Sequence, residues 1–389
     1  MNRDRSVDFL RGCAMILMTL DHVRFYFSSP FINPLDLSKT SASLFLTRWV
    51  THFCAPVFVF LAGLGIALSL MKTKNKKELS KFLITRGLIL VVLEMTLLLW
   101  VWDFSFDYTT APTAMVIWAI GWSMICLAGL IHLPKALIGA FAMFLIFGHN
   151  SVDGFTMNAG KDSLAALWII LHQGGSFQLT SNFKISVLYP LIPWIGVMAL
   201  GYVCGSYYEL SESERRQQFK RIGLSSILLF IFLRYLNVYG DASPWTPQST
   251  SLFTFLSFIN CSKYPPSLLF LLMTLGPLFL LLGTLSLKNS NSFALNSITT
   301  LGKVPMFFYI IHIPIIHLIC LAFASINYQR IDFLFDMVKS FKERVPENYF
   351  YSLSSIYVVW LLCVGLLIYP CIWFAKIKGR GKHVWLRYL

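Results

Sequence analysis

Long apolar runs alternate with short polar stretches along almost the whole chain. A membrane-spanning helix needs about 20 mostly apolar residues, and ten runs reach or approach that length. They lie at residues 9–28, 44–71, 82–102, 114–131, 136–148, 186–208, 222–239, 267–287, 304–325 and 353–375. The apolar segment 164–172 is too short to span and suits a re-entrant or surface helix. The pattern predicts an all-α polytopic membrane protein with about ten transmembrane helices, in a single domain over residues 1–389.

The composition excludes the main alternatives to this fold class. Hydrophobic residues make up 56% of the chain and charged residues 13%, about half the roughly 25% typical of soluble domains. A soluble globule of this size has too little interior to bury so much apolar surface. The eight cysteines show no CxxC or Cys/His spacing, so neither a disulfide framework nor a metal site is expected. Residues 1–8 are polar and precede a run long enough to remain in the membrane, so no cleaved signal is expected.

Membrane topology explains the net charge of +14, because Lys and Arg gather in the short loops between the apolar runs. If the N-terminus is cytoplasmic, 21 of the 32 Lys and Arg residues fall on the cytoplasmic side, in accord with the positive-inside rule. An even number of spans then leaves both termini in the cytoplasm. The loops on the other side are longer and rich in Asn, Ser, Asp, Gly and Trp, which suits the covering of a polar ligand. Nucleic acid is not expected as a partner.

Titratable side chains inside the apolar runs are the strongest indication of function, because each costs several kcal/mol at membrane depth. The first predicted helix carries Asp21, His22 and Arg24. Asp21 and Arg24 are three residues apart, so they share a helix face and can pair. His22 points about 100° away from Asp21 and is a candidate general base. The alternative is an ion pair beside a structural histidine.

Three more histidines lie in predicted spans. Arg48 and His52 are four residues apart at the start of the second predicted helix, and His52 lies at a depth similar to that of His22. His312 and His317 flank a proline in the ninth predicted helix, with His312 near the middle of the membrane. His22 and His52 are candidates for a shared pocket, and an interfacial histidine near a snorkelling arginine is the alternative for His52. His312 and His317 are further candidates, and helix–helix hydrogen bonding is the alternative for them.

Other polar residues in or near the spans have structural explanations. Glu94 and Arg234 are expected to pair with other buried groups, and Gly63 and Gly65 indicate close helix packing. Five residues are expected at the outer surface, where they could contact a substrate: Asp103, Asp107, His149, Asp153 and His172. The sequence contains no GxSxG, Walker or HExxH motif.

Basic residues at helix starts on the cytoplasmic side are candidates for binding phosphates. Arg11, Arg86 and Lys303 occupy such positions, where backbone N–H groups and the helix dipole also favour anions. The alternative is that these residues serve membrane topology alone.

Several motifs resemble the catalytic domain of heparan-α-glucosaminide N-acetyltransferase and its bacterial relatives. They are residues 5–12 (RSVDFLRG) with Ile16-Leu17-Met18, residues 21–24 (DHVR), residues 54–63 (CAPVFVFLAG) and residues 302–305 (GKVP) with Tyr309 and His312. The order and spacing of these motifs extend from residue 5 to about residue 320, so the likeness covers most of the chain.

The resemblance implies a multi-helix transmembrane acyltransferase of the bacterial inner membrane. Acetyl-CoA would enter from the cytoplasm, and the acetyl group would pass to an amino sugar or glycan on the other side. In the eukaryotic enzyme a catalytic histidine follows the first helix, and an asparagine at the helix end aligns with His22. No histidine lies between His22 and His52, so the catalytic histidine of the eukaryotic enzyme has no direct counterpart here. Either His22 or His52 takes this role, or the chain does not catalyse the family's reaction.

A site hypothesis follows from these residues. His22 acts as the base, oriented by Asp21 or another polar neighbour, with His52 as the second choice. Charge or hydrogen bonds from Arg24, Arg48 or His312 stabilise the developing oxyanion. The predicted coenzyme A contacts are Arg11, Arg86, Lys303 and Arg48.

Direct transfer and a covalent acetyl-histidine intermediate both remain open. A proton-coupled secondary transporter is the main alternative function, a structural factor is a second, and exposed aromatic helix faces would allow a homodimer.

Overall fold

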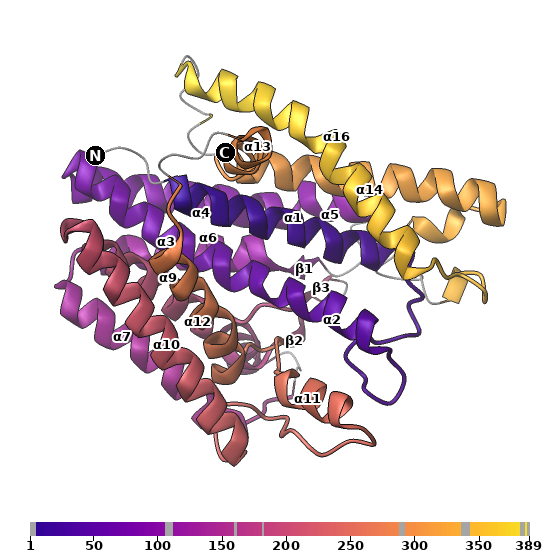
Figure 1. Cartoon of the computed structure of the whole chain (residues 1–389), viewed down its shortest axis with the longest axis horizontal. Coiled ribbons are helices and arrows are strands. Elements are labelled where there is room, and N and C mark those ends of the chain that lie inside the picture. The colour runs from indigo at the N-terminus through magenta and orange to yellow at the C-terminus, as the bar shows by residue number, and fades with distance from the viewer. Residues whose placement is uncertain are drawn as a thin grey trace. The chain divides into compact units, whose positions relative to one another are not determined.

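The chain divides into two compact units, each assembled from separate stretches of sequence. The computed structural model describes residues 5–105, 112–158, 162–180, 183–287, 292–335, 343–381 and 386. Unit 1 consists of Met1–Asn2, Ala55–Thr96 and Ala111–Leu285, and unit 2 of Arg3–Cys54, Leu97–Thr110 and Ser286–Leu389. Helices dominate both units (Figure 1).

Unit 2 is built around α1 (Arg5–Phe27). This helix packs against α13 (Phe293–Leu301), α14 (Pro305–Tyr328) and α16 (Leu353–Gly379) (Figure 1). The remaining elements of the unit are α2 (Ala42–Val50), the 3-10 turn η1 (Thr51–Phe53), α5 (Leu97–Asp103) and the 3-10 turn η5 (Asp332–Leu334). The first and last long helices of the chain, α1 and α16, thus belong to one unit, with α1 as its central helix.

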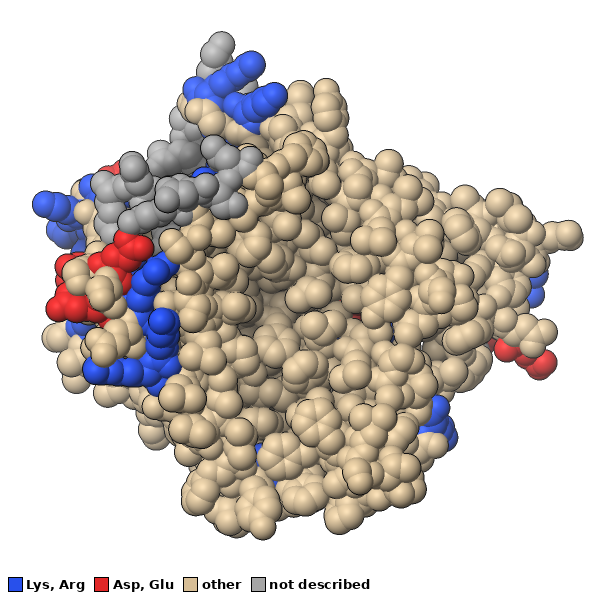
Figure 2. All heavy atoms as spheres, in the orientation of Figure 1, with Lys and Arg blue, Asp and Glu red and all other residues tan. Residues whose placement is uncertain are grey.

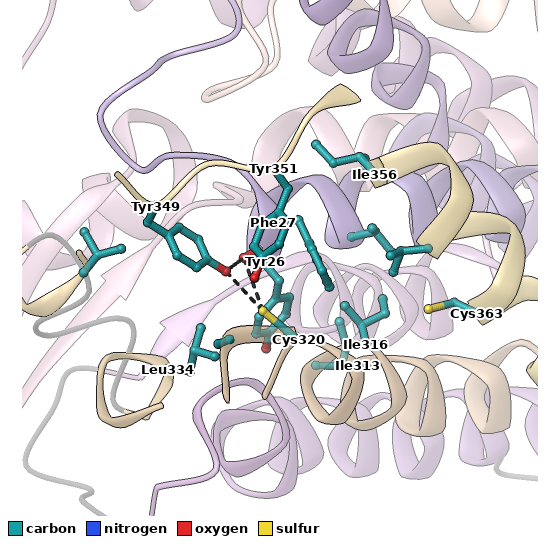
Figure 3. Close-up of a cluster of buried hydrophobic side chains, with 14 of the residues drawn as sticks. Tyr26, Phe27, Ile313, Ile316, Cys320, Leu334, Tyr349, Tyr351, Ile356 and Cys363 are labelled. Carbon is teal, nitrogen blue, oxygen red and sulfur yellow. Dashed lines mark hydrogen bonds between the residues drawn. The ribbon is translucent and has the colours of Figure 1, made fainter. Parts of the chain in front are cut away.

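Side chains from α1, α14, η5, the residues just before α16 and the first half of α16 form the core of unit 2 (Figure 3). The hydroxyl of Tyr349 donates a hydrogen bond of 2.5 Å to the backbone oxygen of Tyr26 and lies 3.2 Å from Sγ of Cys320. Phe27 and Cys363 are completely buried beside them. Because lipid is as apolar as these side chains, close packing and hydrogen bonds hold such a core together.

Unit 1 contains the middle of the chain. Its helices are α3 (Cys54–Thr73, whose first residue belongs to unit 2), α4 (Lys76–Met95), α6 (Val116–Leu130), α7 (Lys135–Gly148), α8 (Ser163–Trp168), α9 (Leu191–Cys204), α10 (Glu212–Leu236), α11 (Ser251–Ile259) and α12 (Leu268–Thr284). Short 3-10 or π turns are η2 (His149–Val152), η3 (Ile169–Gln173) and η4 (Gly205–Glu209). Three helix pairs dominate the packing: α4 with α6, α7 with α9, and α10 with α12.

Small residues and buried charges join the helices of unit 1. A Cβ atom on Gly63 would lie 2.0 Å from the backbone oxygen of Met198, which confirms the predicted close packing at Gly63. Glu94 accepts a hydrogen bond of 3.0 Å from the backbone nitrogen of Trp118, in the first turn of α6. Arg234 donates to the carbonyl oxygens of four residues in the α11 region: Ser243, Ser257, Phe258 and Asn260. Both charged residues therefore have the structural contacts expected for them.

A small β-sheet in unit 1 corrects the all-α prediction. It has three strands in the order β1 (Thr113–Ala114), β3 (Phe183–Val187) and β2 (Gly175–Thr180). β1 runs parallel to β3, with Thr113 opposite Ser186, and β2 runs antiparallel to β3. The predicted helix at residues 186–208 therefore begins later, at Leu191, because Ser186 and Val187 belong to the sheet.

Five helical stretches within the described residues are long and apolar enough to cross a membrane. They are Ala42–Thr73, Lys135–Val152, Leu191–Glu209, Pro305–Tyr328 and Leu353–Gly379, and each overlaps one of the ten predicted runs. Large continuous areas of the surface in Figure 2 carry no Lys, Arg, Asp or Glu side chain, as a protein in lipid requires. The chain is a helical membrane protein, and the count of ten spans and the cytoplasmic placement of both termini remain predictions.

One predicted span is wrong as a single helix. The run at residues 82–102 breaks at Thr96, whose φ of −128° and ψ of −84° are not helical, and forms α4 and α5. Neither proline nor glycine marks this break in the sequence. Its consequence is that α5 belongs to unit 2 and brings Trp102 beside α1.

Candidate functional site

The centre of the candidate site is a pair of histidines from α1 and α14. Nδ1 of His22 lies 2.7 Å from Nε2 of His312, although 290 residues separate them in sequence. His312 is completely buried, whereas His22 is partly exposed. The helices α1 and α14 pack together along unit 2 and hold the two rings in contact.

The backbone of α14 sets the position of the proton on each ring. Nδ1 of His312 lies 2.8 Å from the carbonyl oxygen of Tyr309 and 3.1 Å from that of Phe308. A carbonyl oxygen only accepts hydrogen bonds, so Nδ1 of His312 carries the proton and its Nε2 is an acceptor. His22 must then donate from Nδ1, and in its neutral form the lone pair of His22 lies on Nε2. A histidine with this tautomer fixed is suited to act as a base through Nε2.

Aromatic rings enclose the same stretch of α1. The ring centroid of Trp102, at the end of α5, lies 4.8 Å from that of His22 with the planes 74° apart. Tyr26 stacks on Trp102 and donates from its hydroxyl to the backbone oxygen of Trp102 at 2.5 Å. Sequence reasoning missed Trp102 because it treated residues 82–102 as one helix.

Asp21 and Arg24, which flank His22 in α1, form a charged cluster with Arg48 of α2. Arg24 lies 3.0 Å from one carboxylate oxygen of Asp21, which confirms the predicted pair. Arg48 of α2 lies 2.6 Å from the other oxygen and donates to the hydroxyl of Thr51 at 3.1 Å. Two guanidinium groups thus share one carboxylate, so the cluster carries an excess positive charge.

Two further predicted histidines are buried in the same unit. His52 lies in η1, a turn against which α1 packs. His317 is buried, and its ring stacks on Phe104 with centroids 4.2 Å apart and lies 4.9 Å from that of Tyr26. The helical spacing that we expected between Arg48 and His52 is interrupted by the 3-10 turn, so the two residues occupy different elements.

The predicted phosphate-binding residues lie near the opposite end of α1. Arg11 donates to the backbone oxygen of Gly302 at 3.0 Å and pairs with Asp8 at 3.2 Å. Lys303 follows Gly302 and is exposed. Arg48 bonds to Asp21, which is ten residues along α1 from Arg11 and hence about 15 Å away.

The other predicted site residues with described side chains lie in unit 1, whereas Arg11 and Lys303 lie in unit 2. Arg86, the further phosphate candidate, lies on α4. In unit 1, Nε2 of His172 lies 3.1 Å from Asp153, and the ring of buried His149 is near that of His172. Burial acts to raise the pKa of Asp153, but hydrogen bonds from His172 and Asn150 outweigh burial and hold that pKa below its usual range. Asp107 and the side chain of Asp103 lie outside the described residues.

Potential metal ligands do not gather anywhere in the described part of the chain. No group of three or more His, Cys, Asp or Glu side chains with suitable geometry occurs there. All eight cysteines are free thiols.

The helices and the site together define an integral membrane enzyme. Apolar helices hold a histidine pair of which His312 is buried, and a charged cluster of Asp21, Arg24 and Arg48 lies nearby. A family model described as heparan-alpha-glucosaminide N-acetyltransferase, catalytic, matches residues 3–240, which is more than half of the chain. The chain belongs to this family and is thus a membrane acetyltransferase. The comparison with curated proteins gave no match.

Proposed function

We propose that this protein transfers the acetyl group of cytoplasmic acetyl-CoA to an amino sugar or glycan at the outer face of the bacterial inner membrane. The observation that carries the proposal is the 2.7 Å contact between His22 and His312. Because Nδ1 of His22 donates to His312 in this contact, the lone pair of the neutral His22 ring lies on Nε2. The same helix bears Arg11 near its start. The family match supports acetyl transfer as the reaction class.

The reaction uses His22 as both acceptor and donor of a proton. The amine of the sugar attacks the thioester carbonyl carbon while Nε2 of His22 removes a proton from the nitrogen. The carbon–nitrogen bond forms, the carbon–sulfur bond breaks, and the departing sulfur takes the proton back from His22. The products are the N-acetyl sugar and coenzyme A with a free thiol. Histidine suits this cycle because an imidazole can take up and release a proton near neutral pH.

Neighbouring groups support the two charged stages of this cycle. When Nε2 of His22 is protonated, its Nδ1–H still donates to His312, so the imidazolium keeps its partner. The positive field of Arg24 and Arg48 favours the negative charge that develops on the carbonyl oxygen. Asp21 is occupied by these two arginines, and His312 is the residue that orients His22.

Coenzyme A would lie along α1. Its phosphates would bind Arg11 and Lys303 of unit 2; Arg86 of unit 1 is the separate candidate that the sequence predicts. His22 is 11 residues from Arg11, a rise of about 16 Å, which the extended pantetheine arm would cross to bring the thioester to the histidine pair. The positive-inside pattern supports entry of the cofactor from the cytoplasm.

The direct test of the proposal is acetyl transfer by the purified protein. We expect label from acetyl-CoA to appear on glucosamine, used as a model amino sugar, and coenzyme A to raise the melting temperature through ligand binding. Neither label transfer nor a thermal shift with coenzyme A or acetyl-CoA would contradict the proposal. Solute uptake without either effect would favour the transporter.

Arg11→Ala is expected to weaken coenzyme A binding. Loss of a hydrogen bond to a charged group costs about 1.5–3 kcal/mol, so Kd measured by thermal shift or calorimetry should rise at least about tenfold. Arg86→Ala is a second variant of the same kind. Arg330→Ala serves as the control, because Arg330 is an exposed arginine of unit 2 that pairs with Asp332. Equal affinity in all three variants would remove Arg11 and Arg86 from the phosphate site.

His312→Phe is expected to lower kcat by about 100-fold with little change in KM. The ring volume is retained, but the acceptor that holds Nδ1–H of His22 is lost. His312→Gln should recover part of the rate, because its side-chain oxygen can accept the same hydrogen bond. Equal rates in the two variants would show that His312 does not orient His22.

A further inference from the structure

Trp102 is held against the catalytic face of α1 by several contacts. His22, Phe25 and Tyr26 are spaced three and four residues apart, so they share a face of the helix, and all three rings contact the indole. The hydroxyl of Tyr26 also fixes the backbone oxygen of Trp102. The indole therefore has a fixed place beside the ring of His22, on a different element from His312.

The indole N–H of Trp102 is a buried donor without a hydrogen-bond partner among the described residues. An unsatisfied buried donor costs about 1–3 kcal/mol, and tryptophan N–H groups usually find a partner when buried. Trp360 in the same unit illustrates the usual case, since its Nε1 donates to the backbone oxygen of Ile16 at 2.8 Å. The unsatisfied N–H of Trp102 lies beside the proposed base, which points to a hydrogen bond that it makes only when a substrate is bound.

We infer that Nε1–H of Trp102 donates a hydrogen bond to the thioester carbonyl oxygen and stabilises the oxyanion formed during acetyl transfer. This inference rests on the proposed function. The carbonyl carbon must lie close to His22 when the amine attacks it, and Trp102 is a neutral donor whose ring borders that of His22. A fixed donor aimed at developing charge lowers the barrier because it needs no reorganisation during the reaction.

Trp102→Phe tests the inference, because it keeps an aromatic ring and removes the N–H group. We expect kcat for acetyl transfer to fall by about 100-fold, as when one oxyanion donor is removed elsewhere, with KM for acetyl-CoA and glucosamine nearly unchanged. Trp360→Phe is the matched control. It loses a structural hydrogen bond, so its melting temperature should fall while kcat of the folded protein stays close to that of the wild type.

Benzothienylalanine at position 102 provides a second variant if Trp102→Phe does not fold. It has the shape of tryptophan with sulfur in place of N–H, and we expect the same loss of kcat.

A kcat within threefold of wild type in the folded variant would overturn the inference, as would a raised KM for glucosamine at unchanged kcat. If the wild type transfers acetyl groups and His22→Ala does not, such a result removes Trp102 alone. If the wild type transfers none, the proposed function fails with the inference.

Discussion

His22→Ala is expected to lower the rate of acetyl transfer by about 10³-fold while leaving the protein folded. A positioned acid–base residue contributes about 10²–10⁴-fold to a rate, and the contacts of His22 and His312 place the lone pair of the neutral His22 ring on Nε2. The rate is measured as labelled acetyl groups transferred to glucosamine. Coenzyme A affinity should remain close to that of the wild type, because Arg11 is about 16 Å away along α1.

The matched control for this variant is His132→Ala, since His132 is exposed and lies in unit 1. Its activity should equal that of the wild type. If His22→Ala retains activity within a few-fold, His22 is not the base, and His52 becomes the next candidate. A melting temperature within a few degrees of wild type is needed to assign the loss to chemistry.

Gly302→Ala is expected to cause the largest loss of stability among the variants considered. A Cβ atom at this position would lie 1.8 Å from the backbone oxygen of Asp8, and one at Gly12 would lie 2.0 Å from that of Ile298. Backbone atoms cannot yield as a flexible side chain can, so α1 must separate from the junction of α13 and α14. We expect a destabilisation of at least about 3 kcal/mol, the upper end for overpacking, measured as a lower melting temperature in detergent.

Gly365→Ala is the control for this packing effect. Gly365 lies in α16 of the same unit, and a Cβ atom there would meet nothing within 4 Å. Since glycine is about 0.8–1.0 kcal/mol less favourable than alanine within a helix, this variant should be as stable as the wild type or more so. Similar melting temperatures for Gly302→Ala and Gly365→Ala would contradict the close approach of the helices.

The sequence was sufficient to predict the helices that carry the histidine pair, α1 and α14. Hydrophobic periodicity and length gave α14 and α16 within a few residues, because a membrane helix is an uninterrupted apolar run. The Asp21–Arg24 pair was also predictable, because it depends only on helical spacing. The glycines in the RSVDFLRG and GKVP motifs entered the argument through resemblance, and the structure supplies a physical reason for them in the contact of α1 with α13.

The tertiary contacts of the site could not be predicted in the same way. The bond between His22 and His312 joins helices 290 residues apart, and the pairing of Arg48 with Asp21 depends on the packing of α2. Trp102 was missed because the helix breaks at Thr96 without a proline or glycine to signal it. The small sheet was missed because β1 has only two residues and its partner β3 leads directly into an apolar helix.

The most direct test of the account uses sealed vesicles that contain the purified protein, with labelled acetyl-CoA added outside and glucosamine trapped inside. The account predicts labelled N-acetylglucosamine inside vesicles that carry the wild-type protein and none inside those that carry His22→Ala. Absence of labelled product with the wild type, or equal labelling with both proteins, would contradict transfer across the membrane at His22.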